Sequence, residues 1–179
     1  MTQILINGQG VDPDAKHFTC PITINDQSEL AKLAQLSLSS ASFADANLTD
    51  VGLEFVCRIA TLENLNLQGT EITNEGVRLL RNLTNLRYLR IKDNVQLDND
   101  CVCHLIELPN LIDLQIHETS IDIEGLAHVV SMKSLRDICL QIDDGNFTHD
   151  GLLELSKRMP NCSILAKGDG EYFAGEFNS

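Results

Sequence analysis

The chain has 179 residues, of which 43% are hydrophobic and 4% aromatic with no tryptophan, so an aliphatic core of one domain is expected. Its 13 basic and 26 acidic residues give a formal charge of -13, which disfavours nucleic acid and anionic membranes as partners, because both require clustered Lys and Arg. No stretch approaches the ~20 apolar residues of a membrane span, and residues 1–8 lack the features of a signal peptide, so we expect a cytoplasmic protein.

Residues 1–32 do not share the pattern of the rest of the chain. Short apolar runs at residues 4–6 and 22–24 predict two strands, joined by a loop rich in Gly, Asp and Pro at residues 8–16. Residues 27–33 predict a short helix. A stack of repeats needs a cap over its first apolar face, so we expect residues 1–32 to form an N-terminal cap.

A pattern of the form Leu-x-x-Leu-x-Leu recurs through residues 33–167. The copies begin at Leu33, Leu62, Leu86, Leu111 and Leu135, with a degenerate last copy at Cys162. The central starts lie 24, 25 and 24 residues apart. The outer spacings of 29 and 27 residues place the excess in the loops at residues 39–47 and 142–146. The alternating leucines predict a short strand in every copy.

Each strand is followed by a module in which apolar residues recur at helical spacing, as in residues 72–80, 121–129 and 147–155. Thr or Asp stands where the helix N-cap is expected, and in four of the five copies an acidic residue (Glu75, Asp100, Glu124 or Asp150) follows two positions later, where it complements the helix dipole. The N-cap column comprises Thr49, Thr73, Asp98, Asp122 and Thr148. A glycine column comprises Gly52, Gly76, Gly125 and Gly151, with Cys101 in one copy. Part of the net negative charge is therefore explained by acidic residues that stabilise the N-terminal ends of helices.

One strand–loop–helix–turn unit of this size cannot bury its own apolar face, so the copies must stack. We predict an α/β solenoid with short parallel strands on its concave face, helices on its convex face and about five to six repeats. The prediction places Leu65, Leu89, Leu114 and Ile138 one above another in the interior.

This pattern resembles the leucine-rich-repeat superfamily, in particular the ribonuclease-inhibitor-like and F-box-associated subtypes of repeat. Residues 69–76, Gly-Thr-Glu-Ile-Thr-Asn-Glu-Gly, carry the likeness best, and the resemblance covers about residues 33–167. It implies a protein-binding module that uses its concave face, and it indicates no particular partner. Residues 1–32 do not resemble an F-box, so the ubiquitin-ligase role of that subtype is not supported.

Strand alternation predicts that the third, fifth and seventh positions of each copy face the open side of the sheet. In the first copy these are Gln35, Ser37 and Ser39. Tyr and Arg are enriched at binding hot spots. We therefore predict a partner-binding site composed of Tyr88, Arg90, Lys92, Asp113, His117 and Asp137. In the alternative, Arg90 and Lys92 only pair with Asp113 and Asp137 across adjacent strands, and the basic residues could also attract a small anion.

No catalytic, metal or cofactor site is expected. The six cysteines do not follow a disulfide framework, so reduced thiols are expected. Cys101, Cys103 and His104 lie in one predicted helix without a second ligand pair, which argues against zinc. His117, Asp113 and Cys139 can meet on the open face as a Cys-His-Asp set, but a flat sheet offers no pocket for a reaction.

Residues 168–179 are acidic and rich in Gly, which predicts a mobile C-terminal tail. The aromatic residues Tyr172, Phe173 and Phe177 instead favour docking of the tail against the last strand or a partner.

From the whole pattern we expect a module that binds a protein partner and is a monomer or weak dimer. The alternative is a structural solenoid that assembles edge to edge, because poorly capped sheet edges pair with one another.

Overall fold

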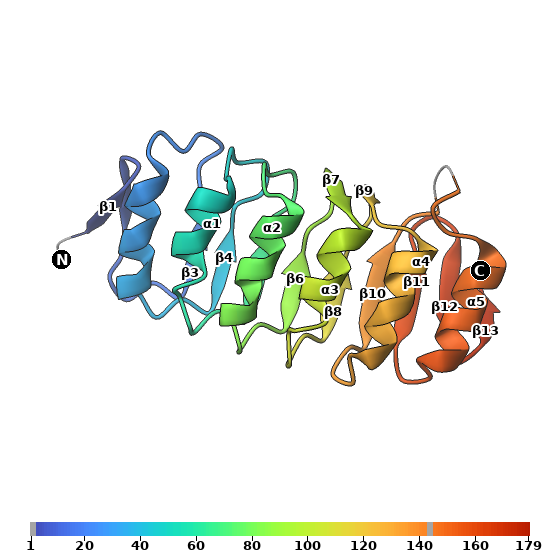
Figure 1. Cartoon of the computed structure of the whole chain (residues 1–179). Helices are drawn as coiled ribbons and strands as arrows, with labels where there is room; N and C mark the ends of the chain where they lie inside the picture. Colours follow the sequence, from blue (N-terminus) through green and yellow to red (C-terminus); the bar gives the residue numbers. More distant parts are fainter. Residues whose placement is uncertain (1–2, 143–144) are drawn as a thin grey trace.

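A long sheet on one side and a row of helices on the other form the molecule in the computed structural model, which describes residues 3–142 and 145–179 (Figure 1). From one edge to the other the sheet contains β3 (His17–Thr19), β4 (Ser40–Ser42), β5 (Asn64–Asn66), β6 (Tyr88–Arg90), β8 (Asp113–Gln115), β10 (Asp137–Leu140), β11 (Ser163–Ala166), β12 (Gly170–Phe173) and β13 (Glu176–Asn178). The strands from β3 to β11 are parallel, and β12 and β13 continue the sheet as an antiparallel hairpin.

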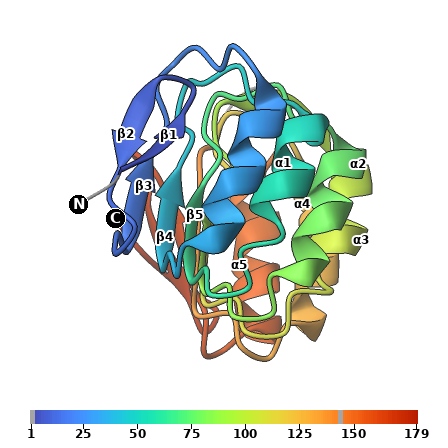
Figure 2. The ribbon, with the colours of Figure 1, turned by 90° about the vertical axis from the view of Figure 1, so that its left-hand side faces the viewer.

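Short helices cover one face of this sheet and leave the other face open (Figure 2). They are η1 (Gln27–Gln35), α1 (Asp50–Val56), α2 (Asn74–Val77) with η2 (Arg78–Asn82), η3 (Asn99–Cys101) with α3 (Val102–Leu105), α4 (Ile123–Leu126) with η4 (Ala127–Ser131), and α5 (His149–Arg158), where η denotes a 3-10 helix. Two small sheets lie outside the main one, β1 (Ile4–Ile6) with β2 (Gln9–Val11) and β7 (Asn94–Asp98) with β9 (Thr119–Ser120). No helix in the described part of the chain has the length and apolar character needed to cross a membrane.

The predicted leucine column forms the centre of the core. Leu65, Leu89, Leu114 and Ile138 are successive register partners in β5, β6, β8 and β10. Each is at most 1% exposed. The predicted stacking of the central copies is therefore confirmed, and the column continues through Ala41 and Ile164 to the aromatic residues Phe18 and Tyr172 near the two ends of the sheet.

The N-cap and glycine columns act together across neighbouring repeats. All five predicted residues occupy N-cap positions, but Thr49 and Thr73 make no cap hydrogen bond of their own. The Asp50 carboxylate of the preceding repeat accepts hydrogen bonds from the Thr73 amide and hydroxyl at 2.9 and 2.6 Å. A Cβ on Gly76 would lie 2.0 Å from Asp50 Oδ1, so glycine leaves room for this contact.

A buried asparagine fastens the loop between β6 and β7. Asn94 Oδ1 accepts hydrogen bonds from the amide and hydroxyl of Thr70 at 3.0 and 3.3 Å. Its Nδ2 donates to the carbonyls of Leu67, Ile91 and Lys92 at 2.8, 2.8 and 3.0 Å. Because Asn94 is fully buried, one side chain satisfies polar backbone groups that water does not reach.

The first repeat differs from its prediction. Residues 33–35 belong to η1, and the strand is β4, whose Ala41 pairs with Leu65. The prediction that Gln35, Ser37 and Ser39 face the open side is therefore wrong, and Ser40 and Ser42 occupy those positions. The true copy begins at Leu38, 24 residues before Leu62, so the predicted 29-residue spacing is also wrong.

The N-terminal prediction is correct for β1 and for a short helix from residue 27. The predicted strand at residues 22–24 is wrong, and Ile22 is exposed. The main sheet instead begins with β3, in which Phe18 is the buried residue between two exposed polar ones. A single apolar residue gives no alternating pattern, so the sequence did not indicate this strand.

The C-terminal copy is displaced by one residue from its prediction. Ile138 pairs with Ile164, so Ile164 is buried and Leu165 is 48% exposed on the open side. Residues 170–178 form the β12–β13 hairpin, and Tyr172 is buried, as the docked alternative for the tail predicts.

Residues 143–144 of the predicted loop insertion lie outside the described residues. The boundaries of the expected cap, solenoid and tail (1–32, 33–167 and 168–179) stay predictions.

Candidate functional site

The face of the sheet that the helices leave uncovered, here called the open face, carries two rows of side chains. The pairing register places one residue of each parallel strand in each row. The first row comprises His17, Ser40, Asn64, Tyr88, Asp113, Asp137 and Ser163, and the second row comprises Thr19, Ser42, Asn66, Arg90, Gln115, Cys139 and Leu165. After Tyr88 the first row continues with two aspartates and a serine, and after Arg90 the second row continues with Gln115, Cys139 and Leu165.

A shallow groove of about 300 Å³ crosses the middle of the open face. It is lined by Ser40, Ala41, Ser42, Asn64, Asn66, Tyr88, Leu89, Arg90, Asp113 and Gln115. Tyr88 is 41% exposed on this face. The groove therefore combines an accessible aromatic ring with groups that donate and accept hydrogen bonds.

Two of the predicted site residues, Arg90 and Asp113, meet through Gln115. Arg90 Nε donates to Gln115 Oε1 at 2.8 Å, and Gln115 Nε2 donates to Asp113 Oδ1 at 3.3 Å. Tyr88 is the register partner of Asp113 on the next strand, and Asp137 is its partner on the other side. The structure thus brings Tyr88, Arg90, Asp113 and Asp137 together on adjacent strands.

The predicted alternative of direct ion pairs does not form in the structure. Within residues 3–142 and 145–179, Arg90 has no carboxylate within 4.0 Å, and Lys92 pairs with Asp93 at 3.0 Å rather than with Asp113 or Asp137. Burial raises the pKa of Asp113, and the neighbouring Asp137 carboxylate adds to this rise. The open face consequently presents a cation on β6 and one aspartate on each of the next two strands, of which Asp113 lines the groove.

Lys92 and His117 each lie two residues beyond the last residue of β6 and β8. His117 is only 6% exposed. Burial lowers the pKa of the His117 imidazole, and the nearby Lys92 and Lys167 lower it further. Of the six predicted residues, His117 therefore offers the least surface to a partner.

The pair of His117 and Cys139 lacks the electrostatics of a catalytic pair. Cys139 Sγ lies 3.9 Å from His117 Nδ1. Burial raises the pKa of the Cys139 thiol, whereas the pKa of His117 is lowered. An activated cysteine needs the opposite shifts, because its reactive form is a thiolate beside an imidazolium. The pair therefore consists of a neutral thiol and a neutral ring.

The buried histidine should make stability depend on pH. Because the pKa of His117 is lower in the folded than in the unfolded chain, the unfolded chain binds more protons below about pH 6.5. We expect the free energy of unfolding to fall between pH 7 and pH 5, and His117→Gln to remove part of that slope. Urea unfolding of both proteins at several pH values measures the difference. Identical slopes would show that His117 does not contribute.

All six cysteines carry free thiols in the structure. Burial raises the pKa of Cys57, Cys101 and Cys162 to about 12 and that of Cys20 to about 11. In the Cys101–His104 segment, Cys101 is buried and the exposed Cys103 donates to the Asp100 carbonyl at 3.1 Å. Among the residues that the structure describes, no group of three His, Cys, Asp or Glu side chains is arranged to hold a metal ion.

Sequence reasoning missed several residues of the groove. Ser40 and Ser42 were missed because the first strand was predicted too early. A count of 24 residues back from Leu62 would have located it. The linking role of Gln115 depends on the orientation of its amide, for which the sequence carries no signal.

Short parallel strands, a helix layer on one face and stacked leucines at intervals of 24 and 25 residues define a leucine-rich-repeat fold. No protein-family model matches the sequence, and no curated protein matches it. Among solved structures, an internalin (inlF) from Listeria monocytogenes matches with a TM-score of 0.55 and 22% sequence identity. The match covers 81% of this chain and 46% of the internalin chain, and at this identity it concerns the fold alone. The ribonuclease-inhibitor-like or F-box-associated subtype stays a prediction.

Proposed function

We propose that the chain is a protein-interaction module that binds a macromolecular partner through its open face. The observation that carries this proposal is the pair of Tyr88 and Arg90 on β6. Tyr88 is 41% exposed, and Arg90 has no ion-pair partner among the described residues. Exposed Tyr and Arg side chains in a groove are typical of binding hot spots.

The proposed contact residues are Tyr88, Arg90, Lys92, Asp113 and Asp137. Arg90 fits an acidic group of the partner, and the two aspartates fit a basic group at the next strand positions. His117 is left out of the contact set because it is nearly buried and does not line the groove. The proposal includes no catalysis and no cofactor. A cytoplasmic location is also part of the proposal, and the six free thiols support it.

Charge reversal on the open face tests the proposal. The variant Arg90→Glu/Lys92→Glu is expected to fold normally, because both side chains are partly exposed, and to recover at least tenfold less partner in a pull-down from the native host. The matched control is Arg58→Glu/Arg78→Glu, which makes the same change in charge on the helix side. Equal recovery by both variants and by the unaltered chain would exclude Arg90 and Lys92 as contacts.

A second candidate function is edge-to-edge self-assembly. It is favoured by β13, the last strand of the sheet, whose three residues are exposed and whose outer edge has no neighbouring strand among the described residues. Light scattering over a range of protein concentrations separates the two functions. A constant mass near 19.8 kDa supports the interaction module, whereas a stable dimer or larger species supports self-assembly.

A further inference from the structure

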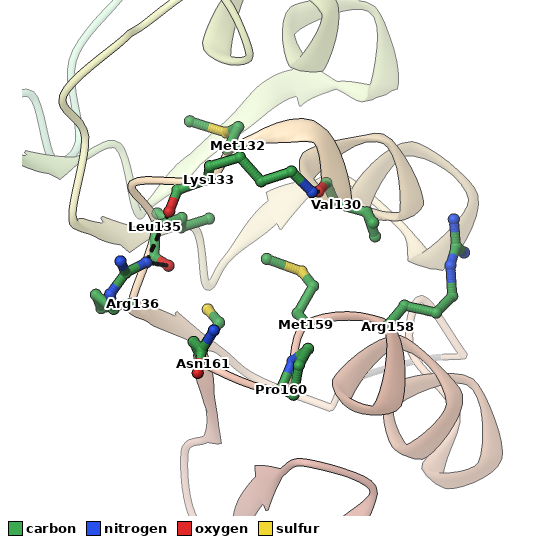
Figure 3. A pocket seen from close by; sticks show the side chains of 10 residues that line it. Val130, Met132, Lys133, Leu135, Arg136, Arg158, Met159, Pro160 and Asn161 are labelled. Carbon is green, nitrogen blue, oxygen red and sulfur yellow. Dashed lines mark hydrogen bonds between the residues drawn. The ribbon is translucent and has the colours of Figure 1, made fainter.

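A second surface, away from the open face, lies where the last two repeats meet. A pocket of about 90 Å³ is enclosed between the turns that follow η4 and α5 (Figure 3). Its apolar lining is made by Met132, Leu135, Met159 and Cys162, all of them buried, with Val130 at one side. An engineered cavity of about 150 Å³ binds benzene, so this pocket has room for one aliphatic side chain.

Cationic side chains surround this apolar pocket. Lys133, Arg136 and Arg158 all line it, and Lys133 extends along its rim (Figure 3). Within residues 3–142 and 145–179, none of the three has a carboxylate within 4.0 Å. Arg136 Nη1 donates to the carbonyls of Lys133 and Leu135 at 2.8 Å, which holds the guanidinium at the pocket. Three unpaired cations at one pocket stand out in a chain of charge -13.

A larger hollow shares Arg136 with the pocket. It has a volume of about 510 Å³ and crosses the turns before β5, β6, β8 and β10. The other lining residues are Glu63, Asn85, Arg87, Asn110, Ile112 and Ser134. Two arginines and three side chains that can form hydrogen bonds therefore face this hollow, and Glu63 is its one acidic lining residue.

We propose that this pocket and hollow bind an extended acidic segment of a protein partner. One aliphatic side chain of the segment enters the pocket, and flanking carboxylates lie beside Lys133, Arg136 and Arg158. Charge complementarity indicates the acidic character, and the neighbouring hollow lined by Arg136 and Arg87 accommodates several residues of extended chain. A free alkyl acid is a poorer fit, because the pocket is too small for a long chain.

Binding of short labelled peptides tests this surface. The probe is a fluorescent pentapeptide with blocked ends, in which leucine stands between two glutamates and glycine stands at each end. Replacing the leucine by serine, or both glutamates by glutamine, is expected to weaken binding about tenfold, because each change removes one of the two complementary features. Fluorescence anisotropy gives the dissociation constants, and 0.5 M NaCl should weaken binding of the acidic probe.

Protein variants locate the binding. The variant Lys133→Glu/Arg158→Glu should bind the acidic leucine probe at least tenfold more weakly, and the control Arg58→Glu/Arg78→Glu should remain within about twofold of the unaltered chain. Equal affinity for all three peptides, no binding at millimolar probe, or an unchanged affinity of the first variant would overturn the proposal. Tighter binding of octanoate than of the peptide would also overturn it, in favour of a free hydrophobic acid.

Discussion

Asn94→Leu is expected to lower the free energy of unfolding by about 4 kcal/mol. The substitution leaves the Thr70 amide and the Ile91 carbonyl without their buried partner, whereas the Leu67 carbonyl keeps the Thr70 hydroxyl as a donor. Each buried group that loses its hydrogen bond costs about 1–3 kcal/mol. The loss is measured by urea unfolding followed by circular dichroism.

The matched control is Asn85→Leu. Asn85 is exposed and donates one hydrogen bond, from Nδ2 to the Ala60 carbonyl at 2.9 Å. Its replacement should change stability by about 1 kcal/mol or less, because water satisfies the group that is left. Similar losses in the two variants would show that the Asn94 network does not anchor the loop.

Leu89→Ala is expected to destabilise the fold by about 3 kcal/mol, because buried leucine-to-alanine changes cost about 2–5 kcal/mol. Leu89 lies in the middle of the stacked column, between Leu65 and Leu114, so its truncation leaves a cavity that both neighbouring repeats line. Urea unfolding measures this effect, and the steepness of the transition reports whether the repeats still unfold together.

Leu165→Ala is the control for the register of the sheet. Leu165 lies on the open face and is half exposed, so its truncation should cost less than about 1 kcal/mol. An effect as large as that of Leu89→Ala would place Leu165 in the core, as the sequence alone predicted, and would contradict the observed pairing of Ile138 with Ile164.

The central repeats were predictable because their leucine column is unbroken from Leu65 to Ile138. The ends were not predictable by the same rule. In the first copy, Ala41 and Phe43 stand where the repeat pattern has leucine. The buried leucines of η1 have a helical spacing that resembles the spacing of leucines in the repeat. In the last copy, adjacent apolar residues at 164 and 165 suit either register, and a shift by one residue exchanges the two faces.

Side chains along a strand alternate between the two faces of a sheet. This alternation correctly predicted that Tyr88, Arg90, Asp113 and Asp137 lie on the open face. Lys92 and His117 occupy the seventh position of their copies, two residues beyond the three-residue strands β6 and β8, and alternation alone does not predict that His117 is nearly buried. The pocket beside Lys133 could not be predicted, because it arises from the packing of two turns that are distant in sequence.

Site-specific photo-crosslinking tests the central claim, that the open face binds a protein partner. A benzophenone amino acid is introduced at Tyr88 in one variant and, as a control, at Val51, an exposed position on helix α1. After irradiation with the partner from the pull-down, we expect a crosslinked complex with the Tyr88 variant and little or none with the Val51 variant. A crosslink from Val51 and none from Tyr88 would contradict the proposed binding face.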